Sequence, residues 1–367
     1  MKILVATLSA LLITLPTYAF DINPFKKYDG SGQLILDTEQ SAGIVASIII
    51  HPVHEELTVK TFTLVKDKGM PGYRLINDQL IEKVIQGVRW NDDPLHLLPD
   101  YPNEWFLNFK HASKISDRIN SNYDLFYRSH QHDLQFLHAM ASSDLETAGA
   151  TQNAIMMWME FTYKISIGFI PIHTRFNHLN QFLTPKAAHT FRKYFTQNEF
   201  RKNWTPAYLF SLRCNREVIL PDWFMPLDCS RTQWLPRKED VQNIALGSLL
   251  HVIQDSFSDS HVSRNPEYEG KYSFIHGRSV INAFNAYIKQ SFHLHRGADS
   301  YPRDFEDSLS EHGFNLEEVS AQIISSVLSD RSKPRHKNQW NRTSTYLKNG
   351  VFKVMNSKAT AGPGKYK

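Results

Sequence analysis

The sequence predicts an all-α protein that folds as one compact, multi-helix domain. Several segments carry apolar residues three or four positions apart, the spacing of a helix that buries one stripe of its surface. Alternating strand patterns are scarce, and neither an internal repeat nor a sharp linker divides the chain. With 367 residues, of which 41% are hydrophobic, the chain is long enough to bury a large core.

The first expected element is a Sec-type signal peptide over residues 1–19. A short basic start, Met1-Lys2, precedes an apolar run from Ile3 to Leu15, and the small residue Ala19 follows. This run is too short to span a bilayer, and its layout is that of a cleaved export signal. We expect cleavage after Ala19 and a secreted protein, either periplasmic or extracellular.

The helical domain is expected over residues 20–330. Its predicted helices span residues 113–122, 150–167, 186–196, 241–256, 278–292 and 316–328. A short strand is predicted over Gly32–Asp37, and loops rich in Pro and Gly separate the helices.

Residues 331–367 are expected as a basic tail appended to this domain. The tail contains ten Lys and Arg residues and no Asp or Glu, so the rest of the chain is mildly acidic although the formal net charge is +4. Such a tail could attract nucleic acid or anionic lipid headgroups. A solvated, partly disordered end is the competing interpretation.

Two cysteines, Cys214 and Cys229, are the only ones in the chain. In an exported protein, a pair this close in sequence predicts a disulfide that closes a surface loop. Neither has a histidine within ten residues, which argues against a cysteine-based zinc site.

The strongest chemical signal lies at the end of the segment 240–255. His251 and Asp255 are four residues apart, so their side chains project from one face of the predicted helix, and His261 follows just beyond its end. An imidazole and a carboxylate one turn apart suit a pair of zinc ions bridged by the carboxylate. For an isolated pair, an intrahelical hydrogen bond is the simpler interpretation, but this helix is the most apolar of the chain, and a buried charge requires a partner.

The spacing His251-x3-Asp255-x5-His261 resembles the central metal motif of bacterial zinc-dependent phospholipases C and of single-strand-specific zinc nucleases. The resemblance covers residues 54 to 280 at the level of motifs. It implies the compact all-α fold of the zinc-dependent phospholipase C type, two or three Zn²⁺ ions in one cleft, and hydrolysis of a phosphodiester.

The resemblance also implies further ligands. His54 resembles the early histidine that binds one zinc ion together with the mature N-terminal residue, here Phe20. Trp90-Asn91-Asp92 resembles a Trp-x-Asp motif whose carboxylate is a ligand and a base, which favours Asp92 over Asp93. Asp92 and Asp255 are thus the expected catalytic residues.

The next implied ligand is a histidine, for which His130 is the first choice, with His138 and His111 as alternatives. The third zinc ion would take His261 and His276. The family places a carboxylate four residues after that second histidine, but this chain has Val280 there. Either the carboxylate comes from one of four other acidic residues, Glu267, Glu269, Asp299 or Asp304, or this ion is weakly held.

The expected function is a secreted zinc-dependent phospholipase C that releases diacylglycerol from phospholipids such as phosphatidylcholine. The segments 133–141 and 158–163 resemble the phospholipase branch more than the nuclease branch. The expected partner is therefore a phospholipid membrane surface, favoured over nucleic acid, and a monomer with no protein partner is expected. A single-strand-specific zinc nuclease and a non-catalytic zinc-binding exported protein are the alternatives.

Overall fold

The computed structural model of the chain is predominantly helical. It describes residues 26–30, 33–36, 52–101, 104–105, 108, 123–197, 199–213, 237–265, 280–291, 294–295, 298, 316–331 and 339–366. Within these ranges, two small two-stranded sheets accompany the helices. This confirms the prediction of a mainly α protein.

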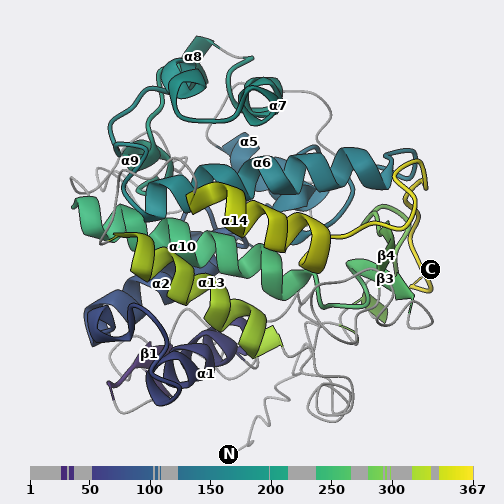
Figure 1. The fold of residues 1–367 in the computed structure, drawn as a ribbon. Coiled ribbons are helices and arrows are strands. Elements are labelled where there is room, and N and C mark those ends of the chain that lie inside the picture. The colour runs from purple at the N-terminus through teal and green to yellow at the C-terminus, as the bar shows by residue number, and fades with distance from the viewer. Residues whose placement is uncertain are drawn as a thin grey trace, which may run out of the picture.

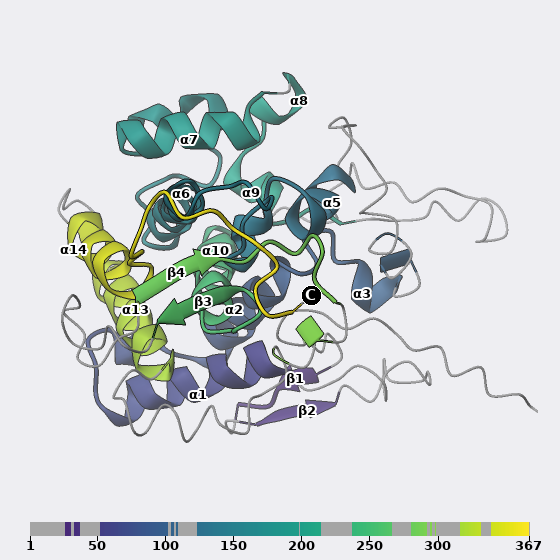
Figure 2. The same cartoon turned by 90° about the vertical axis from the view of Figure 1, so that its right-hand side faces the viewer.

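Helix α10 (Lys238–Asp255) lies at the centre of the molecule, and nearly every one of its residues is buried. It packs against α2 (Asp78–Trp90), α6 (Ala148–Ser166) and α13 (Leu316–Arg331). Helix α1 (Val53–Asp67) packs on α2 and α13 and covers the opposite side of this layer from α6 (Figures 1 and 2). The apolar character of α10 in the sequence thus reflects contact with helices on several sides.

Helices α2 and α10 approach each other closely in the core, and this approach depends on two glycines. A Cβ atom on Gly87 would lie 2.1 Å from the carbonyl oxygen of Ile244, and one on Gly247 would lie 2.1 Å from that of Val84. Only glycine allows two helix backbones to come this close. The contact brings the end of α2 beside the last turns of α10.

Shorter elements surround these helices. They are η2 (Tyr73–Leu75), α3 (Leu97–Asp100), α5 (Tyr123–Gln131), η3 (Gln135–His138), η4 (Phe176–Gln181), α7 (Pro185–Phe195), α8 (Glu199–Lys202), α9 (Pro206–Leu209), α14 (Gln339–Tyr346) and the π-helical turn η6 (Leu347–Val351). The predicted helices 150–167, 186–196, 241–256 and 316–328 are confirmed as α6, α7, α10 and α13.

The prediction of a helix over residues 278–292 is wrong. Residues Val280–Phe284 form strand β4, which pairs antiparallel with β3 (Val262–Asn265). The β-branched Val280 and Ile281 suit a pleated ladder, and they are buried together with Phe284. Their apolar spacing was compatible with a helix, but pairing with β3 decides the conformation. The other sheet joins β1 (Lys26–Tyr28) to β2 (Leu34–Leu36). Of these two strands, β2 lies inside the predicted strand segment.

The expected basic tail is part of the folded core over its described residues. Trp340 and Phe352 are buried, and Thr360 forms a bridge with Thr147 beside the start of α6. Its cationic side chains are therefore attached to an ordered segment that passes the β3–β4 sheet (Figure 2).

Several expectations fall outside the described residues: the signal peptide, the helix over residues 113–122 and the Cys214–Cys229 disulfide. Among the helices that the structure describes, none has the length and apolar character required to cross a membrane.

Candidate metal centre

Helix α10 contributes two side chains to a buried cluster at its C-terminal end. His251 and Asp255 lie one turn apart, and Asp255 is the last residue of the helix. Two tight turns follow, in which Ser258 N donates to Asp255 O and His261 N donates to Ser258 O. These turns fold the chain back and bring His261 to the same cluster, and all three side chains are fully buried.

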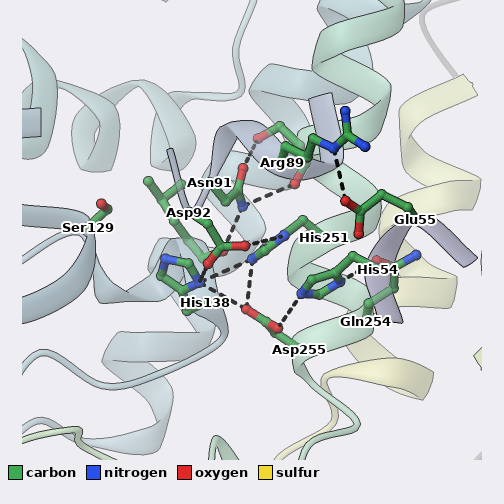
Figure 3. A network of polar contacts seen from close by, with 12 residues as sticks. His54, Glu55, Arg89, Asn91, Asp92, Ser129, His138, His251, Gln254 and Asp255 are labelled. Carbon is green, nitrogen blue, oxygen red and sulfur yellow. Dashed lines mark hydrogen bonds and ion pairs between the residues drawn. The ribbon is translucent and has the colours of Figure 1, made fainter. Parts of the chain in front are cut away.

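Three other segments complete the cluster (Figure 3). His54 lies in the first turn of α1, Asp92 lies two residues beyond the end of α2, and His138 is the last residue of η3. Asn91 connects two of these segments, because its side-chain amide donates to Leu137 O, while its carbonyl oxygen accepts from Ser248 on α10.

The Asp255 carboxylate is the centre of the arrangement. Its Oδ2 lies 3.0 Å from His138 Nδ1 and 3.0 Å from His251 Nε2, and its Oδ1 lies 3.2 Å from His54 Nε2. His261 Nδ1 is 3.7 Å from Oδ2. One carboxylate thus faces imidazoles with both of its oxygens.

Asp92 approaches the cluster from the other side. Its two oxygens lie 3.8 Å from His138 Nδ1 and from His251 Nδ1. Two sets of buried ligand atoms result, each compact enough to hold one metal ion: His54 with His251 and Asp255, and Asp92 with His138 and His251. The neighbouring Asp93 has another role, since its oxygens accept from Leu97 N and Leu98 N at the start of α3.

Hydrogen bonds to carbonyl groups fix the orientation of two further rings. His261 Nδ1 lies 2.6 Å from His138 O, and His130 Nδ1 lies 2.9 Å from Phe126 O. A carbonyl oxygen can only accept, so each Nδ1 carries the proton and each Nε2 keeps its lone pair. Such outer contacts commonly orient histidine ligands in metal sites.

The electrostatics favour neutral imidazoles around an ionised carboxylate. Burial lowers the pKa of His138 and lowers the pKa values of His130 and His251 to about 3. Burial alone would raise the pKa of Asp255, but the neighbouring histidines hold it well below its ordinary value. These are the protonation states in which the groups bind a metal ion, and they leave the cluster negatively charged at neutral pH.

The residues present fit a small cation. His138 Nε2 and His251 Nδ1 are buried and have no hydrogen-bond partner among the described residues. Tetrahedral ions bound at about 2.0–2.1 Å separate their ligand atoms by about 3.3 Å. The spacings of 3.0 to 3.2 Å around Asp255 are close to this value. Two buried His/Asp groups of this chain could therefore hold a metal ion.

The histidine that joins Asp92 in this cluster is His138, the alternative, and not His130, the first choice. His130 lies behind it, with the two ring centroids 5.2 Å apart, and belongs to neither ligand set. Within the segment 133–141, the 3-10 turn η3 carries His138 into the centre. Sequence spacing could not distinguish the two histidines, since both follow Asp92 at a distance that requires an insertion.

Two expected ligands, Phe20 and His276, lie outside the described residues, as do the four candidate carboxylates for a third ion. The sequence reasoning missed His295, whose ring stacks on that of His261 with a centroid distance of 5.1 Å. It also missed Gln254, which contacts His54. No motif marks either residue, because each is defined by a contact between segments distant in sequence.

Comparison with protein-family models, with curated proteins and with solved structures gives no match to this chain. The case for a function therefore depends on the cluster itself.

Proposed function

We propose that the protein is an exported zinc-dependent phospholipase C, with the fold of that family, which hydrolyses the phosphodiester bond of phospholipids. The observation that carries the proposal is the Asp255 carboxylate, buried between His54 on one side and His138 and His251 on the other. Export through the segment 1–19 and action as a monomer are parts of the same proposal.

Zinc is the metal that this donor set favours. Three imidazoles and two carboxylates form the two ligand sets. Calcium and magnesium prefer sites made of oxygen ligands, whereas zinc accepts mixed nitrogen and oxygen ligands in tetrahedral geometry. The short spacing between the ligand atoms agrees with a small ion.

His54, His251 and Asp255 would hold one zinc ion, and Asp92, His138 and His251 would hold another. Bound zinc supplies Lewis acidity and lowers the pKa of water to about 7. Asp92 would bind beside His138 and accept the proton of the attacking water at one of its carboxylate oxygens. Water attacks phosphorus, the bond from phosphorus to the alcohol oxygen breaks, and the proton held by Asp92 passes to the leaving oxygen, so that diacylglycerol and a phosphorylated headgroup result.

Exposed apolar side chains support a lipid substrate. Leu145 is 83% exposed and Ile288 is 54% exposed. They lie on two different loops, which an ion pair between the adjacent residues Asp144 and Lys289 holds together. A surface that contacts a membrane presents apolar side chains beside charged ones.

These loops connect directly to the cluster. Ala141 N donates to Asn285 O over 2.9 Å, and Asn285 N donates to His261 O over 2.7 Å. The apolar side chains are therefore attached to the segment that carries a candidate ligand. The run 158–163, by contrast, is buried on α6, so its aromatic residues pack in the core and do not bear on the substrate.

The proposal is tested with purified mature protein, phosphatidylcholine liposomes and, separately, single-stranded nucleic acid. We expect phosphocholine release that is lost after zinc chelation and in Asp255→Asn, and retained in Asp259→Asn. Asp259 is a matched control because its side chain is 67% exposed and pairs only with Lys365 among the described residues.

Each other outcome has a clear meaning. Cleavage of nucleic acid alone would replace the lipase with the single-strand-specific nuclease. Zinc binding without either activity would indicate a non-catalytic zinc-binding protein. Phosphocholine release that survives both chelation and Asp255→Asn would contradict the proposed centre.

A further inference from the structure

Gln254 precedes the central Asp255 on α10 and points toward α1. Its side chain is fully buried. Its Oε1 lies 2.6 Å from His54 Nδ1, and its Nε2 donates to Thr58 Oγ1 over 3.1 Å. Thr58 Oγ1 in turn donates to the backbone oxygen of His54 over 2.8 Å. Three hydrogen bonds thus form a closed cycle between the two helices, and Figure 3 shows Gln254 beside His54.

The cycle fixes the position of every proton in it. The backbone oxygen of His54 can only accept, so the Thr58 hydroxyl donates its proton to this oxygen and accepts a hydrogen bond from Gln254. Gln254 must therefore present its NH₂ group to Thr58 and its carbonyl oxygen to His54. The proton of the imidazole is then on Nδ1, and Nε2 keeps its lone pair.

The lone pair of His54 Nε2 faces another acceptor, Asp255 Oδ1, at 3.2 Å. Two acceptors at this distance repel each other unless a proton or a metal ion lies between them. We propose that Gln254 is a positioning residue, which fixes the tautomer of His54 so that Nε2 binds the metal ion shared with Asp255. The inference rests on the proposed function, because it requires that the cluster holds metal.

Gln254 orients His54, whereas the backbone orients two neighbouring histidines. His261 and His130 are oriented by main-chain carbonyl groups, which no substitution can remove. His54 is oriented by a side chain, so its ligand geometry depends on one replaceable residue. Outer-shell partners of this kind usually contribute about 10- to 100-fold to metal affinity.

The experiment measures zinc binding to the metal-depleted full mature chain by calorimetry, with absorption spectra of bound Co²⁺ as a second readout. Gln254→Met keeps the side-chain volume and removes both hydrogen bonds. We expect the affinity for one ion to fall about 10- to 100-fold while the other ion binds as in the wild type. Thr58→Val, which removes only the support of Gln254, should weaken the same ion by a smaller factor.

Thr61→Val is the matched control. Thr61 is also buried on α1 and also donates to the carbonyl four residues earlier, at 2.6 Å from Leu57 O, but no bond to Gln254 is described for it. We expect both zinc affinities to be unchanged in this variant. Circular dichroism establishes that each variant is folded, and Gln254→Glu, which can still accept from His54, should retain zinc if Gln254→Met does not fold.

Unchanged affinities in Gln254→Met, with the zinc content lowered in Asp255→Asn, would overturn the inference and leave the proposed function intact. An equal loss in Thr61→Val would overturn it too, because the effect would then be a general one of helix packing. Failure of the wild-type protein to bind zinc would overturn both.

Discussion

Two clusters of buried charge in this protein differ in whether they are complete. On α6, Glu160 Oε1 accepts from Lys164 Nζ at 2.5 Å and from Thr184 N at 2.7 Å, and its Oε2 accepts from Thr184 Oγ1. Lys164 also donates to Phe182 O. Every oxygen of this carboxylate has a donor from the protein itself.

The cluster around Asp255 is different. Its carboxylate is surrounded by imidazoles, yet the candidate ligand atom His251 Nδ1 is buried with no hydrogen-bond partner among the described residues. Burial of polar groups costs free energy unless partners compensate them. The complete cluster joins α6 to the start of α7, whereas the incomplete one could hold a metal ion.

The largest effect is expected when the centre of the incomplete cluster is neutralised. In Asp255→Asn, the charge proposed to bridge two zinc ions disappears, so the zinc content should fall to at most one ion per chain. Hydrolysis should fall by about 10³-fold or more, the scale of losing a main source of transition-state charge stabilisation. Metal analysis of the purified variant and phosphocholine release measure the two losses, and full zinc content in this variant would contradict the bridging role.

A substitution in the Glu160 cluster should lower stability without changing the zinc content. Glu160→Gln leaves Lys164 buried without a carboxylate, which should lower the free energy of unfolding by about 3–5 kcal/mol. The zinc content per folded chain should not change. Urea unfolding measures the loss.

A double variant, Glu160→Gln with Lys164→Met, is the control for this prediction. It removes both charges, so most of the stability should return. A loss of zinc in the single variant would show that the two clusters are coupled, and the comparison between them would then fail.

The histidines around Asp255 should also make the stability of the metal-depleted protein depend on pH. The folded pKa of His251 is lowered to about 3, so the unfolded chain binds a proton below its ordinary pKa of 6.5 while the folded chain does not. The free energy of unfolding of the metal-depleted protein is therefore independent of this group above pH 6.5 and decreases as the pH falls toward 3. Each such histidine lowers it by about 1.4 kcal/mol per pH unit within this range.

Urea unfolding of metal-depleted protein at pH 7 and pH 5 tests this slope. His251→Asn should reduce the slope of the unfolding free energy against pH by the equivalent of about one proton. His173→Asn, at an exposed position, should leave the slope as in the wild type. Equal stability at the two pH values would show that the cluster histidines are already protonated in the folded state.

The sequence predicted the part of this architecture that local patterns encode. The helices α6, α7, α10 and α13 follow from apolar periodicity, and the His251, Asp255 and His261 group follows from spacing along one helix and the turn after it. The strand β4 could not be predicted in this way, because its conformation depends on pairing with β3.

The remaining ligands show the same limit. His138 and His130 are indistinguishable by spacing, and only the 3-10 turn that ends at His138 decides between them. The integration of the basic tail depends on buried contacts of Trp340 and Phe352 with distant segments. Contacts between segments far apart in sequence leave no periodic signal.

The smallest expected effect concerns the surface beside the incomplete cluster. If the loops that carry Leu145 and Ile288 contact the bilayer, Ile288→Asp should lower hydrolysis of liposomes by about fivefold. This corresponds to ~1 kcal/mol, a fraction of the ~1.5–3 kcal/mol for full burial of such a side chain. Hydrolysis of a short-chain, monomeric phosphatidylcholine should not change, because the metal ligands are untouched.

Leu75→Asp is the control, since Leu75 is 46% exposed on η2, which packs on α1 and α13. An equal loss on monomeric substrate would mean that Ile288 acts on the centre itself, and an equal loss in Leu75→Asp would remove the distinction between the two surfaces.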